Sequence, residues 1–195
     1  MTEDTRFPQL VSIACHDLRT PLATVHGFAH TLARAELGEP AARYVGMIEA
    51  ATAQLAELLD ELSLIARIEA RRFEPRLETV DSLELVRSAA AELEEDAVAV
   101  SGSGAPVRVE AEAATRALRQ LARAARRHGG RDSVTLSVRG PEIELAPVER
   151  NAAAVVTGAE FRELGAAAAV ELVRALGGTL ELEGERLLVR LPAGG

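Results

Sequence analysis

The chain has 195 residues, of which 48% are apolar and 27% are charged, a balance typical of a globular protein with one or two domains. A net charge of −8 argues against a general nucleic-acid binder. Because aromatic residues make up only 3%, we expect a core of Ala, Leu, Val and Ile. The single cysteine, Cys15, excludes an internal disulfide and favours a reducing, cytoplasmic location. The sequence shows neither a leader nor an apolar run long enough for a membrane.

The first seventy residues carry two helical patterns. Apolar side chains recur at steps of three and four from Phe7 to Leu32, and again from Ala41 to Ile65. The turn-forming residues 37–40 separate the two patterns, so residues 1–70 are predicted to form an antiparallel helical hairpin. One hairpin with narrow apolar seams cannot enclose a core. We therefore expect a homodimer in which two chains form a four-helix bundle.

From about Arg71 the pattern changes to short alternating segments between helical ones. This mixture predicts that residues 71–195 form an α/β sandwich with one face of its sheet covered. Strands are expected at residues 76–80, 107–110, 133–138, 142–145, 179–182 and 186–191. Helices are expected at residues 82–94, 111–127 and 165–176. Residues 101–104, Ser-Gly-Ser-Gly, are predicted to be a surface loop.

His16 is the residue of the first helix that packing does not explain. At ~100° per residue it points away from the apolar seam, as does Thr20 one turn later. A solvated surface histidine is the plain alternative. An exposed imidazole can also accept a phosphoryl group through one ring nitrogen, while a neighbour such as Asp17 orients the other.

Residues 16–22, His-Asp-Leu-Arg-Thr-Pro-Leu, resemble the phospho-acceptor motif of sensor histidine kinases at every position. The resemblance implies that His16 is the phospho-acceptor. It also implies that Asp17 and Thr20 position a hydrolytic water on a phosphorylated receiver. In this family, receiver domains of response regulators dock beside the acceptor, so we expect the partner contacts to include Arg19, Leu10 and Val11.

The resemblance to a histidine-kinase core continues to the end of the chain, and it implies a degenerate ATPase-like domain of the GHKL or Bergerat type. Alanine stands at 124, where the family has a metal-binding Asn, and alanine offers no oxygen to a cation. Residues 143–157 contain neither the Asp nor the Gly of the adenine site. Glu163 replaces the first glycine of the phosphate turn, where a carboxylate would repel a triphosphate. We therefore expect no bound ATP, cofactor or resident metal, with magnesium supplied by the receiver.

An acceptor without a donor site resembles the histidine phosphotransferases of the sporulation and ChpT types. The implied function is a phosphorelay in which His16 exchanges a phosphoryl group with receiver aspartates, without ATP-dependent autokinase activity. Two alternatives stay open: a pseudokinase or phosphatase that regulates a receiver, and an active sensor-less histidine kinase with an unorthodox ATP site.

Two further features of the sequence could indicate binding sites but also have ordinary structural explanations. The arginines between residues 116 and 131 could bind nucleic acid or an acidic protein, but a solvated helix face is favoured. His26 and His30 have a spacing that can bind zinc, with no third ligand evident nearby.

Overall fold

The computed structural model describes residues 3–35, 37–93 and 97–194, with the side chains of residues 3–7, 9, 10, 12 and 13 outside the description. The chain divides into two compact units, Met1–Arg72 and Phe73–Gly195. The first unit is all helical, whereas the second contains every strand of the described chain.

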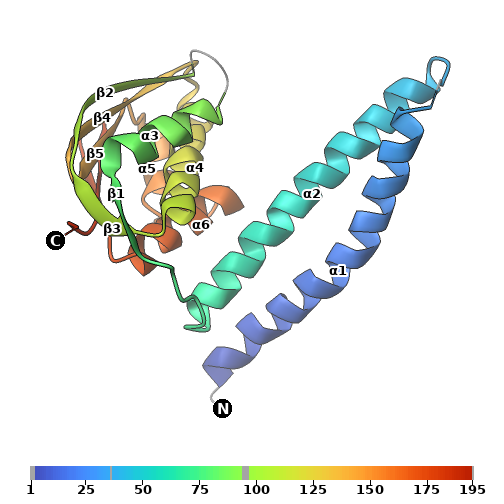
Figure 1. Ribbon diagram of the computed structural model, residues 1–195, viewed down its shortest axis with the longest axis horizontal. Helices are drawn as coiled ribbons and strands as arrows, with labels where there is room; N and C mark the ends of the chain where they lie inside the picture. The colour runs from blue at the N-terminus through green and yellow to red at the C-terminus, as the bar shows by residue number, and fades with distance from the viewer. Residues whose placement is uncertain (1–2, 36, 94–96, 195) are drawn as a thin grey trace. The chain divides into compact units, whose positions relative to one another are not determined.

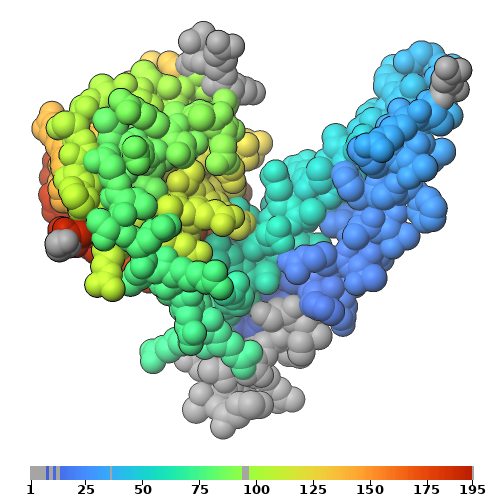
Figure 2. Space-filling model, in the orientation of Figure 1, coloured from blue at the N-terminus to red at the C-terminus, as the bar shows by residue number. Residues whose placement is uncertain are grey.

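The first unit is an antiparallel hairpin of two long helices, α1 (Glu3–Ala33) and α2 (Ala41–Glu69), shown in blue and cyan in Figure 1. Small side chains are buried along it, including Cys15, Ala29 and Ala66, which lets the two helices approach closely. Large apolar side chains stay exposed: Leu18, Val25, Phe28, Leu32, Tyr44, Met47, Ile48, Leu55 and Leu58. Among the described residues of this unit there is no further helix beyond α1 and α2 to cover them, and Figure 2 shows the hairpin in space-filling form.

The second unit is built on a five-stranded sheet in the order β2-β4-β5-β7-β6. Its strands are β2 (Val98–Gly104), β4 (Val134–Gly140), β5 (Glu142–Ala146), β6 (Thr179–Glu183) and β7 (Arg186–Arg190). β2 runs parallel to β4, and the other neighbours are antiparallel. A separate antiparallel pair joins β1 (Glu78–Asp81) to β3 (Pro106–Val109).

Four helices cover one face of this sheet (Figure 1): α3 (Ser82–Ala91), α4 (Ala111–Gly129), α5 (Arg150–Val156) and α6 (Leu164–Ala175). The Asp81 carboxylate caps α3 by accepting the backbone N–H of Leu83 at 2.8 Å. α4 ends at Gly130, whose φ of 64° is a left-handed conformation that glycine adopts at little cost. Ala, Val and Leu side chains from these helices and from the inner sheet face form the core.

The other face of the sheet is charged rather than apolar. Arg190 bonds Glu142 on the neighbouring strand at 2.7 Å, and Arg186 reaches Glu144 at 3.5 Å. Such cross-strand pairs suit a face in contact with water, because each charge has a partner and remains hydrated. The sheet is therefore apolar on its covered face and polar on the opposite one.

The structure confirms the predicted fold class, a helical hairpin followed by an α/β sheet domain covered on one face. Two local expectations were wrong. Residues 101–104 are not a surface loop but the end of β2, paired residue by residue with β4. Gly102, with φ of 102°, lies so close to the Val138 carbonyl that a Cβ would collide with it. The sequence pattern also missed α5, because a seven-residue Ala- and Val-rich segment shows no helical periodicity.

Candidate functional site

α1 presents His16 to solvent, with 80% of its side chain exposed. The ring Nδ1 lies 3.3 Å from Oδ1 of Asp17, whose side chain is 73% exposed. An ionised carboxylate only accepts hydrogen bonds, so this contact favours the tautomer with the proton on Nδ1. The lone pair then resides on Nε2, which can act as a nucleophile. Thr20, one helical turn further on, is also exposed.

Arg19 forms an ion pair across the hairpin. Its Nη2 donates to Oδ1 of Asp60 on α2 at 2.7 Å, with 49% of the Arg19 side chain and 53% of the Asp60 side chain exposed. A half-exposed pair of this kind contributes ~0–1 kcal/mol, so an incoming acidic group can compete for Arg19. Val11 is half-buried, and the side chain of Leu10 lies outside the described side chains.

Cys15, directly before the acceptor, is 1% exposed and packs within the hairpin. Burial raises the pKa of the Cys15 thiol above its ordinary value, a shift that Arg19 opposes and Asp60 reinforces. A buried thiol with a raised pKa is a poor nucleophile. Of these two neighbouring side chains, the imidazole of His16 is accessible to a partner and the thiol of Cys15 is not.

In the second unit, Glu163 connects the end of α4 to the start of α6. Its Oε2 lies 2.9 Å from Nε2 of His128, and its Oε1 lies 3.4 Å from Nη1 of Arg127. Glu163 is also the N-cap residue of α6, where the helix dipole favours a negative charge. A protein carboxylate therefore lies at the helix end that would otherwise suit a phosphate.

The remaining groups around α4 and α6 serve packing. Ala124 and Ala125 are fully buried on α4. A Cβ added at Gly165 would lie 3.0 Å from Cδ of Gln120, a residue that is itself 7% exposed. Gly165 thus allows α6 to lie close against α4.

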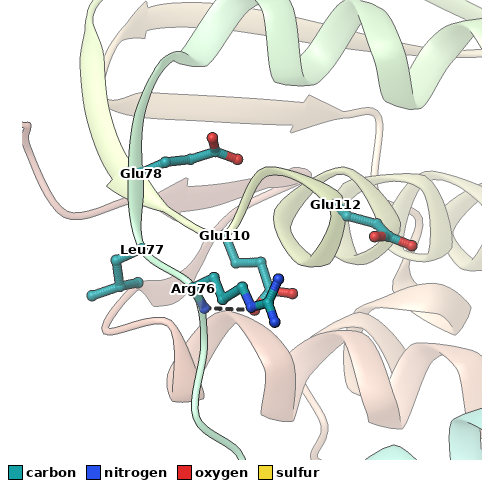
Figure 3. A pocket seen from close by; sticks show the side chains of 5 residues that line it. All are labelled: Arg76, Leu77, Glu78, Glu110 and Glu112. Carbon is teal, nitrogen blue, oxygen red and sulfur yellow. Dashed lines mark hydrogen bonds between the residues drawn. The ribbon is translucent and has the colours of Figure 1, made fainter.

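One cavity of the second unit falls outside the sequence predictions (Figure 3). Its volume is about 420 Å³, and its walls come from the segment before β1, from β1 itself, from the end of β3 and from the start of α4. It is lined by Arg76, Leu77, Glu78, Glu110 and Glu112. The backbone N–H of Arg76 donates to Oε2 of Glu110 at 3.1 Å, a local structural bond. Three carboxylates beside one guanidinium make the cavity unfavourable for phosphate groups.

The arginines of α4 and its end are largely engaged within the unit. Arg119 pairs with Glu92, Arg127 with Glu163, and Arg131 donates to Glu149 at 2.7 Å. Pairing of this kind lowers the net positive potential that nucleic-acid phosphates would need.

The described residues contain neither a metal-binding cluster nor a helix able to span a membrane. Among residues 3–35, 37–93 and 97–194, no three His, Cys, Asp or Glu side chains are grouped as a metal site. In the same ranges, no helix combines the length and apolar character needed to cross a bilayer.

An exposed histidine on a two-helix hairpin, followed by an α/β unit with helices on one sheet face, is the layout that the sequence resemblance to a histidine-kinase core predicts. Comparison with known families agrees with this layout. Residues 9–71 match the family model described as the His Kinase A (phospho-acceptor) domain.

The whole chain resembles solved histidine-kinase structures. It superposes on full-length ShkA in complex with AMPPNP with a TM-score of 0.70 and 21% identity, covering 96% of this chain and 47% of ShkA. It superposes on the Acinetobacter baumannii histidine kinase AdeS with a TM-score of 0.61 and 16% identity, covering 92% and 98% of the two chains. The chain thus spans about half the length of ShkA. A search of curated proteins gives no match.

These likenesses show that the second unit has the fold of a histidine-kinase ATPase domain.

Proposed function

We propose that the protein is a phosphorelay histidine phosphotransferase in which His16 exchanges a phosphoryl group with aspartates of response-regulator receivers. The observation that carries this proposal is the exposed His16, with its Nδ1 facing Asp17, on a hairpin that matches the phospho-acceptor family model. The proposed partner is a receiver domain, which brings an aspartyl phosphate and its own magnesium ion.

The transfer step follows from the tautomer. Nε2 of His16 attacks the phosphorus of the receiver's aspartyl phosphate, a P–N bond forms, and the P–O bond breaks to release the aspartate carboxylate. The ring keeps its Nδ1 proton and becomes positively charged, and the Asp17 carboxylate stabilises that charge. In the reverse direction, a receiver carboxylate attacks phosphohistidine and His16 returns to its neutral form.

The fold implies a nucleotide in the second unit, but the residues present do not fit one. Ala124 has no oxygen for a metal ion and is fully buried. Glu163 brings a carboxylate, already bonded to His128, to the helix end where phosphates would bind. Gly165 is accounted for by its contact with Gln120. These features support a source of phosphoryl groups other than ATP.

The exposed apolar side chains of the hairpin support a homodimer. Phe28 is 68% exposed and Met47 is 63% exposed. Leaving large apolar side chains in contact with water is unfavourable, and an exposed apolar face of this kind marks an interaction surface. Phospho-acceptor domains of this family are typically dimers. We therefore propose that a second copy covers this face and completes a four-helix bundle.

The test uses the pure full-length chain and a receiver carrying a labelled phosphoryl group. Label is expected to move to the wild-type chain and not to His16→Gln, while His128→Gln, the matched control, accepts label normally. Incubation with γ-labelled ATP and magnesium is expected to leave the chain unlabelled. Label from ATP on wild type, absent from His16→Gln, would show a kinase and overturn the proposed phosphoryl source.

The phosphatase alternative predicts a different pattern, because Thr20 lies one turn from His16 and is exposed. It requires the receiver to lose phosphate without label appearing on the chain. In that case Thr20→Ala abolishes the loss whereas His16→Gln retains part of it. Transfer of label to His16 excludes this pattern.

A further inference from the structure

His26 and His30 form a pair of imidazoles on α1, apart from the phospho-acceptor. They are one helical turn apart, with ring centroids separated by 6.4 Å and ring planes within 16° of parallel. Each ring contacts a polar side chain of α2 through Nδ1, and these contacts determine which nitrogen carries the proton.

The proton position on His26 follows from Thr52. The Thr52 hydroxyl has one hydrogen, and its oxygen lies 2.9 Å from the backbone carbonyls of both Ile48 and Glu49, to which that hydrogen is donated. When the hydrogen is donated to these carbonyls, the hydroxyl accepts from Nδ1 of His26, also 2.9 Å away. In this arrangement the neutral His26 ring carries its proton on Nδ1, which leaves a lone pair on Nε2, and it is the arrangement that the proposal below requires.

The same reasoning applies to His30. Its Nδ1 lies 2.7 Å from Oε1 of Glu49, and a carboxylate only accepts. The neutral ring again has its lone pair on Nε2. Metal-ligating histidines show this pattern, in which one nitrogen donates to a carboxylate or other oxygen and the other nitrogen binds the ion.

We propose that His26 and His30 together bind a divalent late transition-metal ion, Cu²⁺, Ni²⁺ or Zn²⁺, through their Nε2 atoms, with water completing the coordination. Imidazole is a preferred ligand of these ions, and affinity should decrease from Cu²⁺ to Ni²⁺ and Zn²⁺. Glu49 and Thr52 act as positioning residues that hold the two rings from α2.

The ring separation is close to what a shared ion needs. With metal–nitrogen bonds of ~2.0–2.1 Å, two imidazoles on a tetrahedral ion have centroids ~5 Å apart. The observed 6.4 Å requires the rings to approach by roughly 1.4 Å and to tilt from their nearly parallel orientation until both Nε2 lone pairs point at the ion. The His30 side chain is 48% exposed and can rotate by this amount, with Glu49 following.

The site also stays open in the proposed dimer. At ~100° per residue, Phe28 points ~160° away from both His26 and His30 around the helix axis. Phe28 is part of the exposed apolar face that the second copy would cover. The imidazole pair therefore lies on a face of α1 that remains in contact with water.

The experiment is a calorimetric titration of the full chain with Cu²⁺, and separately with Ni²⁺, in a buffer that does not chelate. One ion per chain is expected, and His26→Gln/His30→Gln is expected to remove this binding. Glu49→Gln, which keeps the shape but weakens the oxygen that orients His30, should bind about tenfold more weakly. His128→Gln is the matched control and should bind like wild type.

A second readout identifies the ligating atoms: on Zn²⁺ addition, the ¹⁵N resonances of Nε2, and not of Nδ1, are expected to shift in both rings. Binding that persists in the double variant, or an unchanged affinity in Glu49→Gln, would overturn the inference. His16→Gln should leave metal binding intact, so a failure of the proposed phosphotransfer and a failure of this site are distinguishable. Circular dichroism of each variant checks that α1 and α2 remain folded.

Discussion

Replacing Gly165 by alanine tests whether this glycine is kept for packing. The new Cβ would lie 3.0 Å from both Cδ and Oε1 of Gln120 and 3.1 Å from its Nε2. Both residues are buried, and Gln120 is held on α4, so relief requires α6 or the amide to move by a few tenths of an ångström.

Two effects of opposite sign decide the magnitude. Overpacking a buried contact costs ~1–3 kcal/mol. Replacing a helical glycine by alanine contributes ~0.5–1 kcal/mol in the stabilising direction. We expect a net loss of ~0.5–2 kcal/mol in the free energy of unfolding of the second unit. In a Gln120→Ala background the clash disappears, and the same glycine replacement should stabilise by up to ~1 kcal/mol.

The assay must report on the second unit alone. The sequence has no Trp, and its one Tyr, Tyr44, lies in the hairpin, so fluorescence is unsuitable. Hydrogen exchange of α4 peptides, followed by mass spectrometry across a urea series, gives the unfolding free energy of that unit. The packing explanation is refuted if Gly165→Ala has the same effect with and without the Gln120 side chain.

Three further predictions concern the hairpin and the core. If the proposed homodimer forms, Phe28→Glu should convert it to a monomer in sedimentation velocity, whereas Ala23→Glu, an exposed position on another face of α1, should not. A stable Phe28→Glu dimer would contradict the proposed interface. Leu121→Ala, at 1% exposure, should cost ~2–5 kcal/mol of unfolding free energy measured by the same hydrogen-exchange series, and a loss below ~1 kcal/mol would place it outside the core. Because burial raises the pKa of the Cys15 thiol, iodoacetamide at pH 8 should alkylate it more slowly in the folded chain than in urea, and equal rates would disprove the burial. The free energy of unfolding should also fall as the pH rises above the ordinary thiol pKa of 9.0, because the thiol of the unfolded chain ionises first.

The hairpin and the exposed position of His16 could be predicted because their signals are local. Apolar spacing along α1 and α2 needs only neighbouring residues, and the direction of His16 follows from helix geometry. The strands of the second unit were also predictable, within a few residues, where they alternate apolar and polar side chains, as β5 does. Edge strand β2 was not, because its Ser-Gly end forms a strand only through pairing with β4.

Contacts between distant segments explain the rest of what the sequence missed. Nothing in the pattern around Arg19 indicates that Asp60 would bind it, since the pair forms only once α2 folds back along α1. In the sequence, Glu163 is notable only because it stands where the resembled family has a glycine. The folded unit shows that its carboxylate lies within hydrogen-bond distance of His128.

The sequence by itself predicted the exposed position of His16, the hairpin and the fold class of the second unit, because these depend on periodicity and on a short contiguous motif. The tertiary structure decided how the histidines are used. Whether an imidazole is exposed, bonded to a carboxylate or oriented by a hydroxyl depends on side chains from another element, which only chain folding brings within hydrogen-bond distance.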